Sequence, residues 1–331
     1  MKLQIQLKPT LPEIVRKSRK HHIPENYFLQ LLVFIAVFVG VQLVEYAVML
    51  PFLMDSVYAW GSQQIADVGT VEGTAVLRYL NELMMDPANV RIMLFSTGVG
   101  TLGVLFYTGV IEERRARTLG FHKKHILPQY LLGLLAGFAA FSSVIGLDLL
   151  FGGLQFEGYV GGFGGNLLLF LAGFLIQGMS EEVLCRGFMM TSALRHHDLW
   201  WAVGVNSVLF GLMHCMNKGF TLFALANLIL YAVMISLYVL RTGSLWGACA
   251  FHGIWNFSQG NFYGLPVSGI NVGDTVFSMS LKGSDLVSGG AFGLEASIGT
   301  TIVMLLWIAG LLFLPNPFSK NPAGSQTETA A

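Results

Sequence analysis

Three charged side chains lie close together in an apolar part of the sequence. Glu181, Glu182 and Arg186 follow the apolar run 167–176 and are followed directly by Gly187. An ionisable side chain at membrane depth costs about 2.5–3.5 kcal/mol on insertion scales, so it usually faces a protein interior or a wet cavity. We therefore expect these three residues to form either a functional site or a structural ion pair.

Helical spacing gives the three charges different expected roles. Glu182 and Arg186 are four residues apart, so they share a helix face and can pair. Glu181 is turned by about 100° from its neighbour, and it has no counter-charge on its own face. A buried carboxylate without such a partner can serve as a general base. The structural alternative is an ion pair that holds two helices together.

Two later apolar segments carry polar residues at helical spacing. His214 follows Phe210 by four residues, and Asn256 follows His252 by four. Residues four apart lie on one helix face. A single histidine in an apolar helix is more often a structural residue, but two histidines with an asparagine in register favour a site.

Distance along the chain places the first two polar points at one depth. Glu181 and His214 are equally far from the turn centred at 197–198, which is about 25 Å at 1.5 Å per residue. The segment with His252 reaches the same level if its own turn, 241–244, lies deeper. Three helices would then offer a carboxylate, two imidazoles and an amide to one cavity.

Two kinds of chemistry fit this set of side chains. A carboxylate with a histidine can take a proton from water, while an amide and an imidazole can stabilise the oxyanion of acyl-bond hydrolysis. Two histidines and a glutamate are also a common zinc set, although no His-Glu-x-x-His helix is present. Cys249 is near His252, but nothing in the sequence indicates an activated thiol.

Composition predicts the fold class. Of 331 residues, 54% are hydrophobic and 11% are charged, whereas soluble domains carry about 25% charged residues. We expect an all-α polytopic membrane protein with about eight spans and an intramembrane catalytic cavity. A net charge of zero gives no reason to expect a nucleic-acid partner. The eight predicted spans are 27–54, 91–111, 129–151, 166–190, 200–216, 220–240, 243–259 and 297–314.

The predicted organisation is a single transmembrane domain, 27–315, with its catalytic core at about 166–260. A basic juxtamembrane arm, 1–26, precedes it, and a disordered tail, 316–331, follows it. The basic loops alternate so that both termini lie inside.

Three further features have simpler expected roles. Glu45 and Asp148 lie near span ends, and we expect both to be structural. The glycine-rich segment between the last two spans is either a lid or substrate rim, or a plain connecting loop.

The three motifs together resemble the CAAX-prenyl-protease and bacteriocin-processing family of intramembrane proteases, which includes the Ras-converting enzyme type. The resemblance covers about residues 166–260, and its motifs appear in family order. They are Glu-Glu-x-x-x-Arg at Glu181, Glu182 and Arg186, Phe-x-x-x-His at Phe210 and His214, and His-x-x-x-Asn at His252 and Asn256.

The resemblance implies an eight-span helical fold and an endopeptidase that cleaves near the C-terminus of a membrane-associated substrate. Glu181 would activate the water, with His214 assisting. His252 and Asn256 would form the oxyanion site, and the remaining Glu–Arg pair would orient the first helix. We expect no metal cofactor, because a neutral amide and imidazole account for the third motif without one.

Several alternatives remain open from the sequence. A zinc-dependent protease could use the same residues, and a non-catalytic scaffold or bacteriocin self-immunity protein could use the same fold. The expected partners are the lipid bilayer and a membrane-associated peptide or lipidated protein substrate. The expected location is the cell membrane, with several membrane passes.

Overall fold

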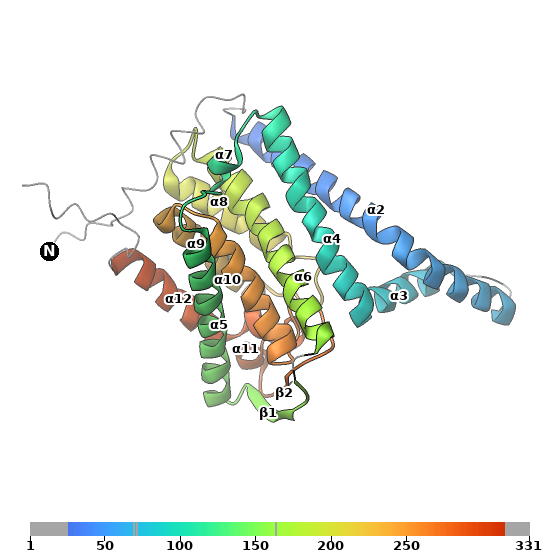
Figure 1. The fold of residues 1–331 in the computed structure, drawn as a ribbon. Coiled ribbons are helices and arrows are strands. Elements are labelled where there is room, and N and C mark those ends of the chain that lie inside the picture. The colour runs from blue at the N-terminus through green and yellow to red at the C-terminus, as the bar shows by residue number, and fades with distance from the viewer. Residues whose placement is uncertain (1–25, 69, 71, 163, 315–331) are drawn as a thin grey trace, which may run out of the picture.

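The computed structural model describes residues 26–314 except 69, 71 and 163. The predicted basic arm, apart from its last residue, and the predicted tail 316–331 lie outside these described residues. The described chain is mostly helical (Figure 1). Its helices are α2 Tyr27–Val68, α3 Gly73–Met84, α4 Pro87–Phe106, α5 Ile126–Leu150, α6 Gly165–Glu182, α7 Thr191–Ala193, α8 Leu199–Leu212, α9 Leu222–Thr242, α10 Trp246–Phe257, α11 Asp285–Ser288 and α12 Ile298–Phe313.

The all-α membrane architecture predicted from composition is confirmed, while the count of eight spans is not. Within the described residues, five helices are long and apolar enough to cross a membrane. The other three predicted spans coincide with shorter helices, α8, α10 and α12, of 14, 12 and 16 residues. The five long segments are Tyr27–Val68, Pro87–Ile111, Ile126–Leu150, Gly165–Ala193 and Leu222–Thr242.

A two-stranded antiparallel sheet was not predicted. Strand β1, Leu154–Tyr159, follows α5 and pairs with β2, Phe277–Leu281, which lies in the segment before α12. The pair joins the loops at one end of the bundle (Figure 1). It ties the glycine-rich region between α10 and α12 to the rest of the protein.

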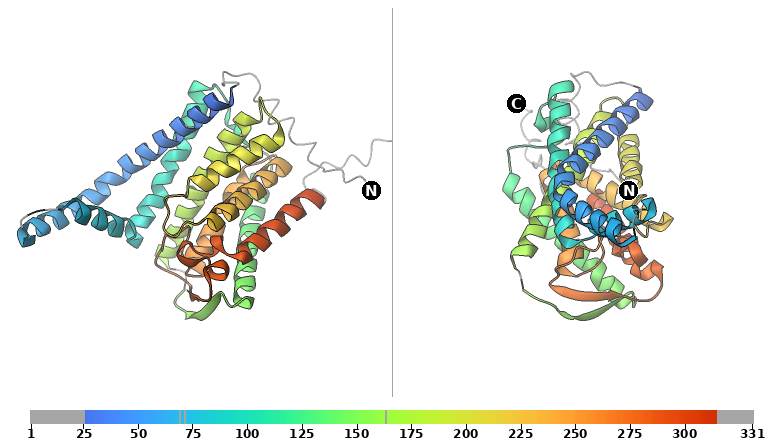
Figure 2. Two further views of the ribbon diagram at one scale, coloured as in Figure 1. Left: turned by 180° about the vertical axis from the view of Figure 1, so that it is seen from behind. Right: turned by 90° about the vertical axis from the view of Figure 1, so that its right-hand side faces the viewer.

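Helix α2 stands apart from the compact bundle. It diverges from α4, and the amphipathic helix α3 bridges the far ends of the two (Figures 1 and 2). The bridge is held by the rings of Trp60 and Tyr79, which stack at 4.5 Å, and by a hydrogen bond from the Tyr79 hydroxyl to the Ser56 carbonyl. The buried residues of α2 lie between Phe34 and Leu53, so this part of the helix packs against the bundle and the remainder diverges from it.

Glycines bring the central helix α10 into backbone contact with α5 and α6. A Cβ on Gly178 of α6 would lie 2.5 Å from the Gly253 nitrogen, and one on Gly133 of α5 would lie 2.2 Å from the Gly247 carbonyl oxygen. Small residues at crossings let membrane helices approach this closely. Because Gly253 follows His252 directly, the crossing fixes that histidine beside the carboxylates of α6.

Helix α6 changes geometry directly after its two glutamates. The segment Val183–Met190 is a π-helix in which every residue is buried. Such segments are frequent at functional sites, because the wider turn redirects side chains. Here it carries Arg186, which lies fully buried behind the carboxylates.

Candidate active site

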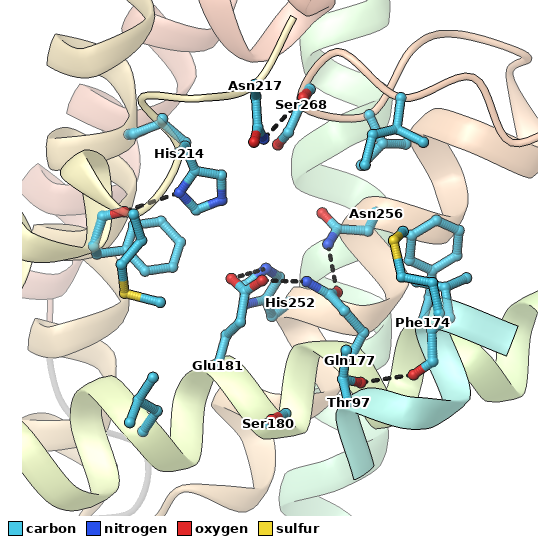
Figure 3. A pocket seen from close by; sticks show the side chains of 18 of the residues that line it. Thr97, Phe174, Gln177, Ser180, Glu181, His214, Asn217, His252, Asn256 and Ser268 are labelled. Atoms are coloured by element: carbon cyan, nitrogen blue, oxygen red, sulfur yellow. Dashed lines mark hydrogen bonds and ion pairs between the residues drawn. The ribbon is translucent and has the colours of Figure 1, made fainter. Parts of the chain in front are cut away.

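One cavity of about 260 Å³ lies within the helical bundle. Its walls come from α2, α4, α6, α8 and the turn after it, α9, α10, the loops that precede α12, and α12 itself. The structure places all four predicted catalytic side chains on this cavity (Figure 3). They are Glu181, His214, His252 and Asn256.

Glu182, the second carboxylate of α6, lies beneath the cavity and connects the three motifs. Glu182 is fully buried, and its Oε1 accepts hydrogen bonds from Arg186 Nη1 at 3.0 Å and from His252 Nδ1 at 2.8 Å. The Arg186 guanidinium also lies over the ring of Phe210, 4.5 Å from its centroid. The predicted pairing of Glu182 with Arg186 is confirmed, and the pair also contacts both histidine motifs.

This arrangement fixes the orientation of the His252 ring. An ionised carboxylate only accepts hydrogen bonds, so Nδ1 of His252 carries a proton toward Glu182. The other nitrogen, Nε2, then faces Glu181, whose Oε2 is 3.7 Å away. The imidazole therefore lies between two carboxylates, one buried beneath the cavity and one at its surface.

Glu181 has one occupied and one free oxygen. Its Oε1 accepts a hydrogen bond from Gln177 Nε2 at 2.5 Å. The side-chain oxygen of Gln177, Oε1, in turn accepts one from Asn256 Nδ2 at 2.9 Å. No hydrogen-bond partner for Oε2 occurs among the described residues. An oxygen free to accept from water is what a general base needs.

Gln177 is a site residue that the sequence analysis missed. It lines the cavity and connects Glu181 with Asn256 (Figure 3). The signal for it was available, because it precedes Glu181 by four residues and therefore shares its helix face.

His214 lies in the turn after α8 and faces Glu181 across the cavity (Figure 3). Its Nδ1 is 2.9 Å from the Phe210 carbonyl oxygen. Because a carbonyl accepts hydrogen bonds, Nδ1 carries the proton and Nε2 of the neutral ring has a free lone pair. His214 can therefore take up a proton inside the cavity.

The glycine-rich segment and the loop before α12 supply a further wall. Ser268 and Glu295 line the cavity, and Ser268 donates to the Glu295 carboxylate from its backbone nitrogen at 2.5 Å and from its hydroxyl at 2.9 Å. Burial raises the pKa of Glu295, and the nearby His214 opposes that shift. Neither residue carries a local sequence signal, so both were missed.

The two carboxylates expected to be structural have different surroundings. Asp148 accepts a hydrogen bond from the Ser297 hydroxyl at 2.7 Å, at the N-terminus of α12, and is structural as expected. Glu45 lines the cavity, and its Oε2 accepts a hydrogen bond from Gln42 Nε2 at 2.9 Å. A Cβ on Gly100 would lie 2.3 Å from its Oε1, so the glycine of α4 makes room for this carboxylate.

The zinc alternative depends on how the candidate ligands are placed. Within the described ranges, no group of three or more His, Cys, Asp and Glu residues is placed to hold a metal ion. The Nδ1 atoms of both histidines are engaged, one by Glu182 and one by a backbone carbonyl, and histidines that bind zinc through Nε2 are commonly held in the same way. Cys249 is buried and does not line the cavity.

Comparison with protein families supports the resemblance found in the sequence. Residues 163–258 match the family described as Rce1-like, type II CAAX prenyl endopeptidase Rce1-like. The matched segment contains all three motifs, so the resemblance is confirmed over this part of the chain. No curated protein and no solved structure matches.

Proposed function

We propose that this integral membrane protein is an intramembrane endopeptidase of the CAAX type. It cleaves membrane-associated or prenylated protein and peptide substrates near their C-termini, using water activated by Glu181. The family match over residues 163–258 supports the reaction class. The observation that carries the proposal is the free Oε2 of Glu181, which faces His252 Nε2 at 3.7 Å in a cavity shared with His214 and Asn256.

The proposed reaction begins with a water molecule between Glu181 and the scissile carbonyl carbon. Glu181 takes a proton as the water oxygen attacks, and the carbonyl oxygen becomes negatively charged. Asn256 donates a hydrogen bond to that oxyanion from its amide, and His252 donates one from Nε2 in its doubly protonated form, because its Nδ1 proton is directed at Glu182. The intermediate collapses when the C–N bond breaks, and a protonated His214 delivers its proton to the leaving amine nitrogen. Glu181 then passes the proton it took from water to His214, which restores both groups.

The remaining motif residues act as positioning residues in this proposal. Glu182 holds the His252 ring through Nδ1, and Arg186 balances the charge of that carboxylate. A carboxylate in this position fixes both the tautomer and the orientation of an imidazole. No metal enters the proposed mechanism.

A comparison of protein termini in cells tests the proposal and identifies substrates. Membrane proteins would be compared from cells that carry the wild type, Glu181→Gln, or the matched control Glu82→Gln, which changes an exposed glutamate of α3. We expect a set of new C-termini with the wild type and with Glu82→Gln that is absent with Glu181→Gln. Identical termini in all three cell types would show that the protein is not a protease of this kind.

A further inference from the structure

Glu295 is a buried carboxylate on the cavity wall that neither the three motifs nor the proposed mechanism uses. It lies in the loop before α12, outside the segment that matches the family, and only 9% of its surface is exposed. We propose that Glu295 is a positioning residue for His214, which stabilises the imidazolium that His214 becomes when it carries a proton. This inference rests on the function proposed above.

The carboxylate is held in place by neutral donors. The Ser268 backbone nitrogen and hydroxyl donate to it at 2.5 and 2.9 Å, and Gln259 Nε2 lies 3.4 Å away. Within the described part of the chain, Ser268 and two imidazoles, those of His214 and His252, are what favour its charged form. A buried carboxylate is costly without a cation. A protonated His214 would therefore lower the cost of burying Glu295.

Ser268 also connects Glu295 to the turn that carries His214. The Ser268 carbonyl accepts a hydrogen bond from Asn217 Nδ2 at 3.0 Å, and Asn217 lies three residues after His214 (Figure 3). The Asn217 backbone nitrogen donates to the His214 carbonyl at 3.0 Å, which closes the turn. One serine thus holds both the histidine turn and the carboxylate.

Close backbone contacts make this wall rigid. A Cβ on Gly219 would lie 2.5 Å from the Phe292 nitrogen, and one on Gly293 would lie 2.2 Å from the Pro266 carbonyl oxygen. Both glycines have a positive φ, 76° and 99°, which other residues rarely adopt. The turn after α8 and the loop before α12 therefore cannot separate without breaking these contacts.

The proton transfers of the proposed reaction define when Glu295 and His214 would interact as a charged pair. His214 must carry a proton when the C–N bond breaks, and that proton moves to the amine nitrogen as the ring returns to its neutral form. The other titratable groups on the cavity are Glu45 and Tyr46 of α2, Glu181 of α6, Tyr231 of α9 and His252 of α10. Glu181 is itself protonated at this stage. The carboxylate of Glu45 interacts with Glu181 and not with His214, whereas that of Glu295 interacts with His214, so Glu295 is the charged partner.

The test compares Glu295→Gln with Asp148→Asn in the full-length protein. Glutamine keeps an acceptor for Ser268 but removes the charge. Asp148 is a matched control, because it is a buried carboxylate beside the start of α12 that does not line the cavity. The probe for activity is an internally quenched farnesylated peptide with a C-terminal CAAX sequence, cleaved in proteoliposomes.

We expect Glu295→Gln to lower kcat about tenfold at neutral pH and to leave KM within about twofold. The high-pH limb of the kcat profile, where the general acid loses its proton, should move down by about one pH unit, because an opposite charge nearby shifts a pKa by about 1–3 units. Asp148→Asn should leave the profile in place. An unchanged profile and kcat for Glu295→Gln would overturn the inference, while an active Glu181→Gln would overturn the proposed function instead.

A second measurement does not depend on cleavage. Diethyl pyrocarbonate modifies neutral imidazole, so the pH dependence of His214 modification, followed by mass spectrometry, reports the pKa of that histidine. We expect the midpoint to fall by about one unit in Glu295→Gln and to stay unchanged in Asp148→Asn. Equal midpoints in all three proteins would show that Glu295 does not act on His214.

Discussion

The protein contains two buried glutamate–arginine pairs with the same separation and very different surroundings. Arg114 lies 3.0 Å from Glu112, and Arg186 lies 3.0 Å from Glu182. The first pair is in the connection after α4, near the end of the bundle, and the second is beneath the cavity. Comparing them separates what a buried pair does for the fold from what it does for the site.

The pair outside the cavity is a closed network. Every nitrogen of the Arg114 guanidinium has a hydrogen-bond partner, and besides Glu112 these partners are Thr118, Thr191 and Ser192. Thr191 and Ser192 belong to α7, directly after the π-helix. The network therefore anchors the end of the α6 region to the connection after α4, and all its contacts are structural.

The pair beneath the cavity is left open. Within the described residues, Arg186 Nε and Nη2 and Glu182 Oε2 have no hydrogen-bond partner. The Glu182 carboxylate also accepts a hydrogen bond from His252, and the Arg186 guanidinium lies on the ring of Phe210. A buried ion pair left this incomplete is a poor source of stability. The feature that distinguishes the functional region is therefore the hydrogen bond from His252 to Glu182, because both regions contain a buried ion pair.

Replacing each pair by apolar side chains gives the largest expected contrast. We expect Glu182→Leu with Arg186→Met to leave a folded protein but to lower cleavage by about 10³–10⁴-fold, because His252 loses the acceptor that fixes its ring. Glu112→Leu with Arg114→Met should keep cleavage within about threefold. Initial rates with the farnesylated peptide measure both. Equal losses of activity would remove the distinction between the two regions.

A smaller effect is expected within the cavity itself. Gln177→Leu removes the hydrogen bond to Glu181 and the link to Asn256, so kcat should fall by about 10–100-fold while the thermal midpoint changes little. Replacing Gln63, an exposed glutamine of α2, by leucine is the matched control. A Gln177→Leu protein with wild-type kcat would show that this link does not position the general base.

The smallest effect concerns pH and the pair outside the cavity. Burial raises the pKa of Glu112, and Arg114 only partly offsets this. The contribution of Glu112 to stability is therefore fully present below the ordinary glutamate pKa and is lost as pH rises through the higher folded value. The free energy of unfolding of the wild type should fall as pH rises between these two pKa values, and we expect this pH dependence to be weaker in Glu112→Gln. Chemical denaturation in detergent at a series of pH values measures it, and an unchanged slope would contradict the assignment.

The part of the site that was predictable from sequence lies on single helices. Spacing alone paired Glu182 with Arg186, and equal distances from one turn placed Glu181 and His214 on the same cavity. Gln177 could have been found by the same spacing rule. These relations are short-range, because helical geometry fixes which residues share a face within one or two turns.

The parts that could not be predicted depend on contacts between distant segments. Glu295 reaches the cavity because glycines hold the loop before α12 against the loop after α10, and Glu45 reaches it because Gly100 leaves space between α2 and α4. Glu112 and Arg114, two residues apart in the basic segment between α4 and α5, are both buried. Nothing in local periodicity indicates such contacts.

The central claim is that Glu181 activates water for peptide hydrolysis without a metal. The most direct measurement is cleavage of the farnesylated peptide by purified protein in proteoliposomes with a metal chelator present, for the wild type and for Glu181→Gln. We predict full wild-type activity with chelator, a single cut upstream of the C-terminus, and no detectable cleavage by a folded Glu181→Gln protein. Cleavage by Glu181→Gln, or wild-type activity that disappears with chelator and returns with zinc, would contradict the account.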